Sequence, residues 1–255
     1  MAGAIFTSEQ AGVVTVTISN PSRKNAATRQ MFIDLARAFE EAQSARLLIV
    51  KGDGQNFCTG ADLSDADGMG GQSPIEFMRT VSEAALRLHE LTIPKLAVVD
   101  GLAVGAGLSL AAGCDLILAT NRSSYSAIFA KRGLSLDLGA SWFLPRRVGM
   151  AKAKELTLLA NLFGADEALA MGLINWVVEP EDLAAREAEL TKELSTAATM
   201  ALRRSNALLD ASVQSSLAEA LEAESQTQVE SFTSEDTKEA ALAFFQKRTP
   251  NFIGQ

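Results

Sequence analysis

Two glycine-containing segments of this 255-residue sequence carry backbone groups that could take part in chemistry. The run GLAVGAG, from Gly101 to Gly107, follows a predicted strand and precedes a predicted helix. A free helix N-terminus presents unpaired N–H groups and the positive end of the helix dipole, and both stabilise negative charge. The segment NFCTGADL, from Asn56 to Leu63, also follows a predicted strand. Both segments could face an anion, although close packing alone would require the same glycines.

The run from Gly101 to Gly107 also invites a nucleotide-binding interpretation, but neither nucleotide pattern is complete. A dinucleotide fingerprint counted from Gly105 needs a small residue five positions later, where the sequence has Leu110. A phosphate-binding loop needs Gly-Lys-Ser or Gly-Lys-Thr after its glycines, and neither follows. The run therefore favours stabilisation of a developing negative charge over binding of a nucleotide.

Side chains that bind metals or act as nucleophiles are few. The two cysteines, Cys58 and Cys114, cannot form a disulfide framework or a four-cysteine zinc site, and they lack CxxC spacing. The single histidine, His89, argues against a histidine metal centre or a Ser-His-Asp triad, and we expect it on a helix surface. The sequence therefore predicts no metal site.

The composition limits the partners of the chain. It is 47% hydrophobic and 21% charged, as in ordinary globular proteins, and its length suits one large or two modest domains. Its net charge of −8 has the wrong sign for binding nucleic-acid phosphates, so we expect no nucleic-acid partner. The start lacks a signal-peptide pattern, and Asp100 and Asp115 interrupt the longest apolar stretch. We expect no membrane partner and a cytoplasmic location.

Strands and helices alternate along the first half of the chain and would position both glycine-containing segments. Short β-branched or apolar runs predict strands at residues 13–18, 46–51, 96–99, 116–118 and 174–178. Capping residues and apolar residues at helical spacing predict helices that begin after Thr28 and Ser73, cover residues 108–113, and begin after Ser234. The alternation implies crossover connections, and hence an α/β fold with a largely parallel sheet covered by helices.

The pattern beyond Ala151 is almost entirely helical. We therefore predict an α/β core over residues 1–195 and a helical C-terminal region over residues 196–255. No linker rich in proline, glycine or serine separates them, so the C-terminal region is not expected to be an independent domain.

Four motifs together resemble those of the enoyl-CoA hydratase/isomerase (crotonase) superfamily. They are FCTGADL at residues 57–63, PKLAVVDGLAVGAG at residues 94–107, NPSRKNA at residues 20–26, and FFQKRTPNF at residues 244–252. The similarity spans essentially the whole chain. It implies a ββα spiral core, a helical C-terminal trimerisation region, a homotrimer or hexamer, and acyl-CoA thioesters as substrates. Coenzyme A would be present only as the thioester carrier, and the resemblance implies no other cofactor.

The resemblance also implies roles for individual residues. The thioester carbonyl would lie between the backbone N–H groups of Ala61 and Ala106, where each fixed donor stabilises a developing oxyanion by about 3 kcal/mol. Further contacts with coenzyme A would come from Lys24, Ala26, Thr59, Gly60, Asp62, Leu63 and Lys247. A lysine suits the coenzyme phosphates, although Lys247 equally suits the end of a helix, where a cation complements the dipole. The Asp62 side chain usually serves loop structure in the family.

The residues that would catalyse hydration are absent. Hydratases of the family use two glutamates to activate water, and Ser109 and Phe129 occupy the matching positions. A serine cannot accept a proton at neutral pH without a partner base, and phenylalanine cannot accept one at all. Ordinary hydratase activity is therefore not expected.

One carboxylate, Asp137, lies where the family's isomerases place a proton-transferring acid, in a segment that resembles theirs over residues 129–149. Moving a double bond from C3 to C2 needs a single group that removes a proton from C2 and returns it at C4. Neighbouring apolar residues would raise the pKa of Asp137 by desolvation. Three alternatives stay open: Asp137 caps a helix that begins near Gly139, Ser109 and Asp137 together manage water in a hydratase, or the protein binds acyl-CoA without turnover.

Overall fold

The computed structural model describes residues 3–62 and 73–254. Its first element is a hairpin of two antiparallel strands, β1 (Ala4–Gln10) and β2 (Val13–Ser19). The sequence predicted β2, in which Val14, Val16 and Ile18 point alternately into the core. It did not predict β1, because most of this edge strand is exposed and carries no alternating apolar pattern.

A six-stranded sheet forms the centre of the molecule, in the order β1-β2-β3-β4-β6-β9. The strands after the hairpin are β3 (Leu47–Gly52), β4 (Lys95–Val99), β6 (Leu116–Thr120) and β9 (Trp176–Val178). From β2 to β9 every neighbouring pair is parallel, as predicted. The strand predicted over residues 174–178 is confirmed but starts later, at Trp176.

A second, smaller sheet has the order β5-β7-β8. Its strands are β5 (Leu102–Val104), β7 (Ser124–Ser126) and β8 (Phe163–Gly164). The chain passes from β4 of the large sheet to β5 of the small sheet and then into α3. The segment after β3 also runs from the large sheet to the small one, because a bridge between Cys58 and Ala103 places it beside β5. This repeated strand, strand, helix path is the ββα spiral that the resemblance implied.

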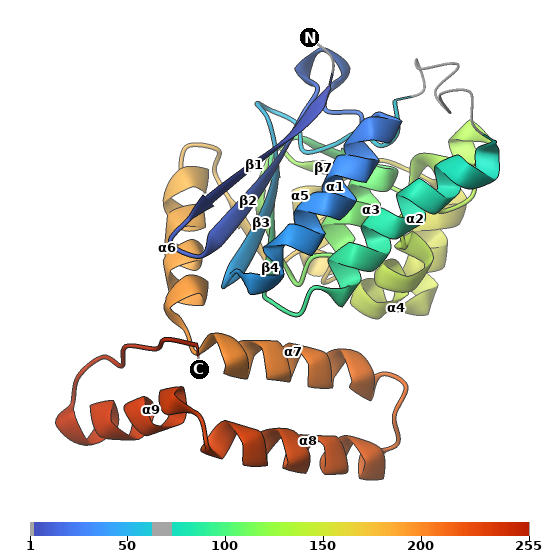
Figure 1. Cartoon of the computed structure of the whole chain (residues 1–255). Helices are drawn as coiled ribbons and strands as arrows, with labels where there is room; N and C mark the ends of the chain where they lie inside the picture. The colour runs from blue at the N-terminus through green and yellow to red at the C-terminus, as the bar shows by residue number, and fades with distance from the viewer. Residues whose placement is uncertain (1–2, 63–72, 255) are drawn as a thin grey trace.

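Helices cover both faces of the large sheet (Figure 1). The main core cluster lies under helices α1 (Arg29–Glu41), α2 (Pro74–Glu90) and α3 (Ala106–Ala112). As predicted, Thr28 caps α1, and its Oγ1 accepts a hydrogen bond from the Met31 N–H at 3.4 Å. On the opposite face, Leu190 of α6 (Leu183–Thr196) packs on a second cluster that includes Ile49 and Val98.

The remaining helices lie in the connections between strands or form the C-terminal region. They are η1 (Pro21–Arg23), η2 (Ala42–Ser44), η3 (Ile128–Arg132), α4 (Ala140–Leu159), α5 (Ala165–Ala170), α7 (Thr199–Ser212), α8 (Leu217–Phe232) and α9 (Glu235–Gln246). As predicted, Ser234 caps the last helix, accepting from the Thr237 N–H at 3.1 Å. Within the described ranges, no helix combines the length and the apolar character that crossing a bilayer requires.

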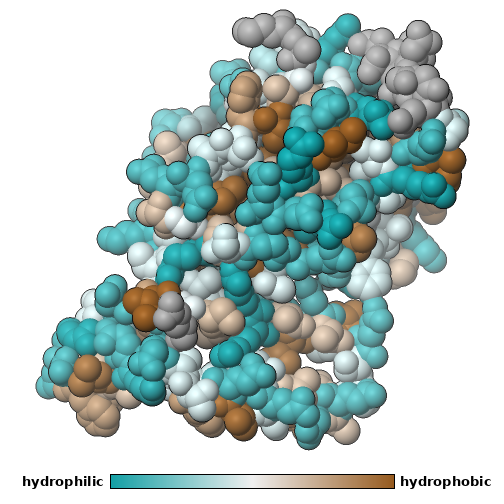
Figure 2. Space-filling model, viewed as in Figure 1, coloured by the Kyte–Doolittle hydropathy of each residue, from teal (hydrophilic) through white to brown (hydrophobic). Residues whose placement is uncertain are grey.

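Helices α7, α8 and α9 extend below the core in Figure 1, so the predicted boundary at residue 195 falls near the end of α6. Two arginines join them to the core: Arg46 donates to the carbonyl of Ala197, and Arg203 donates to that of Ala45. Helix α8 buries none of its side chains, and hydrophobic side chains appear among polar ones in this lower part of the surface (Figure 2). The division into two regions and the trimerisation role stay predictions.

Candidate active site

The two glycine-containing segments meet at a cavity of about 540 Å³. Thr59, Gly60 and Ala61 of the first segment line it, together with Gly105 and Ala106 of the second. Residues from β5, β7, η3 and the loop before α4 also line it, as do Lys24 and the segment that follows α4. The cavity therefore brings together segments that lie far apart in the sequence.

The close approach of the two segments depends on backbone hydrogen bonds and on one glycine. The Cys58 N–H donates to the Leu102 carbonyl at 2.9 Å, and the Val104 N–H donates to the Cys58 carbonyl at 2.9 Å. A Cβ atom at Gly107 would lie 2.0 Å from the Cys58 carbonyl oxygen, a distance at which the backbone would have to move. Glycine at this position therefore lets the first turn of α3 lie directly against the Cys58 segment.

The N–H group of Ala61 is turned away from the neighbouring Ala27 segment. Ala27 forms a parallel bridge with Ala61: its N–H donates to the Gly60 carbonyl at 2.7 Å, and its carbonyl accepts from the Asp62 N–H at 2.9 Å. In a parallel bridge the residue between these two bonds directs its own N–H to the opposite side. The Ala61 N–H therefore points away from Ala27, and Ala61 itself lines the cavity.

The N–H group of Ala106 is the first of helix α3. First-turn N–H groups have no carbonyl partner within their own helix. Gly105 supplies the turn into the helix with φ +58°, and its own N–H donates to the Ser126 carbonyl at 2.9 Å. A Cβ atom on Gly60 would lie 3.4 Å from the Ala106 nitrogen, so the residue before Ala61 adjoins Ala106 directly. The structure thus brings the two predicted oxyanion donors together.

Asp137 lines the same cavity from the loop that precedes α4. Its Oδ1 atom is buried and has no hydrogen-bond partner among the described residues. Burial raises the pKa of this carboxyl from 3.8 to about 6. The helix-cap alternative is wrong, because Gly139 is the N-cap of α4 and no side chain caps that helix.

The two positions that would hold hydratase glutamates have different surroundings. Ser109 is fully buried within α3, and its hydroxyl donates to the Gly105 carbonyl at 3.2 Å. Phe129, in η3, lines the cavity. Among the described residues that line this cavity, Asp137 has the only carboxyl group.

Only some of the residues expected to contact coenzyme A line the cavity. Lys24, Thr59 and Gly60 line the cavity, and the Thr59 hydroxyl donates to the Lys24 carbonyl at 3.1 Å. Ala26 is buried beside this loop, and Asp62 follows Ala61 in the first segment.

Two further residues of that expected set lie elsewhere. Lys247 is exposed at the end of α9 and does not line the cavity within this chain. Leu63 lies outside the described residues.

The cavity wall also carries two cations that the sequence motifs did not predict. Lys131 and Arg132 are exposed in η3 and line the cavity together with Lys24. Lys131 donates to the Asn161 side-chain oxygen at 3.0 Å. The adjacent pair of basic residues shortly after Phe129 was the available signal. These three cations make the cavity wall attractive to phosphate groups even though the chain is acidic.

The cysteines offer no alternative chemistry. Both are buried and unpaired, and burial raises the pKa of Cys58 to about 11 and that of Cys114 to about 12. Their thiols therefore stay protonated at neutral pH and are poor nucleophiles. In the part of the chain that the structure describes, no three His, Cys, Asp or Glu residues form a group that could hold a metal ion.

The ββα spiral defines a protein of the crotonase fold. The chain belongs to the enoyl-CoA hydratase/isomerase family, whose model matches residues 8–255. It is an enzyme of that superfamily, and the superfamily acts on acyl-CoA thioesters.

Known relatives cover nearly the whole chain. The chain is 32% identical to a 1,2-epoxyphenylacetyl-CoA isomerase of Escherichia coli, over 98% of both proteins. It is 34% identical to a probable enoyl-CoA hydratase of Rhodobacter capsulatus, over 96% of this chain and 95% of that protein. The crystal structure of a putative enoyl-CoA hydratase from Streptomyces coelicolor superposes with a TM-score of 0.93 at 31% identity, covering 98% of this chain and 94% of that one. The names of these relatives include an isomerase and hydratases, so similarity alone does not show which of the two reactions this chain catalyses.

Proposed function

We propose that the protein is an enoyl-CoA isomerase that moves a double bond from C3 to C2 of an acyl-CoA thioester. The observation that carries the proposal is Asp137, the only described carboxyl group that lines the cavity, with one oxygen buried and unpartnered. A carboxylate in this state can accept a proton from substrate without first breaking a hydrogen bond within the protein.

Two backbone donors would activate the substrate. With the thioester oxygen between the N–H groups of Ala61 and Ala106, removal of a proton from C2 places negative charge on that oxygen. Preorganised donors stabilise this enolate more than the neutral thioester, by about 3 kcal/mol each. Both residues line the cavity, and their segments are hydrogen-bonded to each other.

Asp137 would transfer the proton. Its carboxylate removes the proton at C2, and the electron pair of that C–H bond enters the conjugated dienolate. The same carboxyl group then returns the proton at C4, the C2–C3 double bond forms, and Asp137 is ionised again. A pKa of about 6 suits both steps, because such a group is mostly ionised at neutral pH yet holds a proton better than an ordinary aspartate.

The cations would hold the coenzyme part of the substrate. Lys24, Lys131 and Arg132 line the cavity and carry charges complementary to the phosphates of coenzyme A. Coenzyme A enters as the substrate's thioester carrier, and the mechanism uses no other cofactor.

A hydratase in which Ser109 and Asp137 share a water molecule has less support. Ser109 is fully buried, does not line the cavity, and donates its hydroxyl to the Gly105 carbonyl. A non-catalytic acyl-CoA binder would need the same donors and cations, so only turnover separates it from the isomerase.

A pair of substrates tests the proposal. With a 3-enoyl-CoA, the isomerase should produce the ultraviolet absorption band of the conjugated thioester. With a trans-2-enoyl-CoA, a hydratase would instead bleach that band. Asp137→Asn should abolish turnover while acyl-CoA affinity survives, and Asp182→Asn, an exposed aspartate at the start of α6, is the matched control. Full activity of Asp137→Asn, or binding without turnover by the unaltered protein, would overturn the assignment.

A further inference from the structure

Asn25 is fully buried next to the candidate active site but does not line the cavity. It lies in the loop between β2 and α1 and follows Lys24; the two residues have φ values of +58° and +52°. Asparagine tolerates this left-handed conformation better than most residues. Two consecutive residues in this conformation form a sharp turn, which the surrounding contacts must stabilise.

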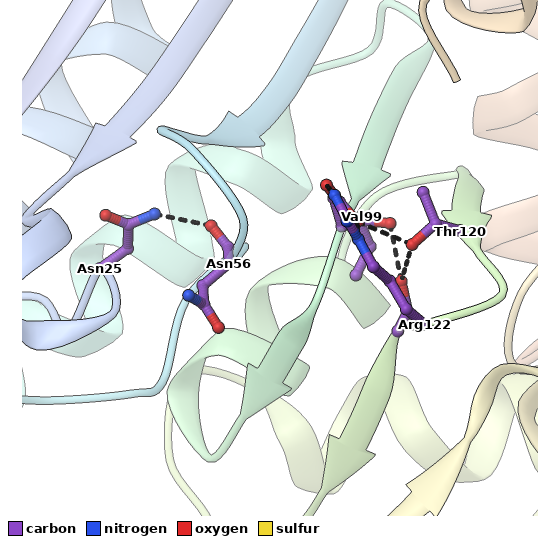
Figure 3. Close-up of polar contacts among 7 residues, drawn as sticks. Asn25, Asn56, Val99, Thr120 and Arg122 are labelled. Atoms are coloured by element: carbon purple, nitrogen blue, oxygen red, sulfur yellow. Dashed lines mark hydrogen bonds and ion pairs between the residues drawn. The ribbon is translucent and has the colours of Figure 1, made fainter. Parts of the chain in front are cut away.

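The Asn25 side chain connects this loop to the loop after β3. Its Oδ1 accepts a hydrogen bond from the Asn20 N–H at 2.9 Å. Its Nδ2 donates to the Asp53 carbonyl at 2.9 Å. The same nitrogen donates to the Asn56 carbonyl at 2.6 Å (Figure 3). The amide thus uses its acceptor and both of its donor hydrogens.

Both of the connected loops lead to Ala61. From Asn56, the chain runs through Phe57 and Cys58, which are hydrogen-bonded to Leu102, to Gly60 and Ala61. From Asn25, the chain reaches Ala27, which bonds to the residues on either side of Ala61. The Asn25 amide therefore connects the two segments whose bridge orients the Ala61 N–H.

We propose that Asn25 is a positioning residue that holds the Ala61 N–H in the oxyanion hole. The inference rests on the proposed function in one respect, since it takes Ala61 as a donor to the thioester oxygen. A misplacement of about 1 Å in such a site can lower turnover about a hundredfold without removing any group that touches substrate.

The chemistry at this position requires an amide. An aspartate would place carboxylate oxygens against the carbonyls of Asp53 and Asn56 and would supply no hydrogen to either. A glycine would retain the left-handed backbone at no steric cost but would remove the connection. Asn25→Asp and Asn25→Gly therefore break the same contacts for different reasons.

The matched control is Asn56→Ala. Asn56 takes part through its backbone carbonyl, and its side chain points away from Asn25 (Figure 3). Removing that side chain leaves the contact intact within the same loop.

Infrared spectroscopy of a bound thioester measures the oxyanion hole directly. The probe is butyryl-CoA labelled with ¹³C at the thioester carbonyl, which is saturated and is not turned over by the isomerase. Hydrogen bonds from the hole should lower the carbonyl stretching frequency in the unaltered protein and in Asn56→Ala. In both Asn25 variants we expect much of this shift to be lost, turnover to fall by about tenfold to a hundredfold, and probe affinity to weaken by less than about tenfold.

Each result decides the inference. A full carbonyl shift in a folded Asn25 variant would overturn it, as would global unfolding of both variants, because Asn25 would then stabilise the fold rather than position one amide. A shift in the unaltered protein without isomerisation, lost in the Asn25 variants, would support the inference while the proposed isomerase activity failed. No shift in the unaltered protein would remove both the oxyanion hole and the inference.

Discussion

Asp137 and Ala140 are connected through the backbone and not through the carboxylate. The Ala140 N–H donates to the Asp137 carbonyl oxygen at 3.0 Å, which leaves the side chain out of the first turn of α4. The Oδ1 atom is consequently buried without a partner among the described residues, within a cavity. This placement explains both the raised pKa and the availability of the carboxylate to substrate.

The pH dependence of turnover should report the ionisation of Asp137. Since desolvation raises its pKa to about 6, the carboxylate base is depleted below that pH and fully formed above it. We expect kcat/KM for a 3-enoyl-CoA to rise with pH through about 6 and then level off. A profile measured between pH 4.5 and 8 that stays flat through this range would contradict the assignment of the base.

The same burial should make Asp137 destabilising at neutral pH. Its pKa in the folded state, about 6, exceeds the ordinary value of 3.8, so the folded state binds this proton more tightly than the unfolded state. This destabilisation of the folded state is absent below about pH 4. It increases between about pH 4 and pH 6 and is constant above that range. Its upper limit is about 3 kcal/mol, reduced by the part of the carboxyl group that reaches solvent.

Asp137→Asn should therefore raise the free energy of unfolding at pH 7 by about 1–3 kcal/mol and change it little at pH 4. Urea unfolding at both pH values measures the difference. Equal effects of the substitution at the two pH values would show that the carboxyl group is not strained by burial.

Local patterns in the sequence predicted much of the fold. The strand containing Leu48 and Val50 is an uninterrupted apolar run because helices cover both faces of its sheet. β1 was missed because its solvent-facing side chains follow no pattern, and β5 was missed because three residues within a glycine-rich run carry too little signal.

Site geometry was harder to predict than site composition. The sequence singled out Asp137, but only the structure distinguishes a helix cap from an unpartnered carboxylate, since both use the same residue type. The role inferred for Asn25 depends on contacts with carbonyls 28 and 31 positions away, which no local pattern encodes. Only the structure shows that Lys131 and Arg132 belong to the site, because η3 places them on the cavity wall that Lys24 also lines.

Gly107→Ala should disrupt the meeting of the two segments. The added methyl group would lie 2.0 Å from the Cys58 carbonyl oxygen, so α3 or the Cys58 segment must move. We expect a loss of about 1–3 kcal/mol in the free energy of unfolding and a strong loss of turnover. Gly164→Ala is the control, because its Cβ atom would meet nothing within 4 Å. Unchanged stability and activity of Gly107→Ala would show that the close approach is dispensable.

The cations at the cavity should affect substrate binding more than chemistry. The double variant Lys131→Ala and Arg132→Ala removes two positive charges from the wall. Each exposed charge contributes up to about 1 kcal/mol, so KM should rise about tenfold while kcat changes little. The increase in KM should be smaller at high salt. The control is Lys154→Ala, which replaces an exposed lysine of α4 and should leave KM unchanged. An unaltered KM in the double variant would place the phosphates elsewhere.

The surface of α8 should be covered in solution by other copies of the chain. Leu217, Leu221, Val229 and Phe232 are each more than half exposed, and several exposed apolar side chains on one helix commonly mark an interface. Together with the family resemblance, this predicts a homotrimer or hexamer. Leu221→Lys should shift the assembly toward monomers in sedimentation velocity, because burying a charge in an apolar interface is unfavourable. A monomeric unaltered protein would show that these helices serve another purpose.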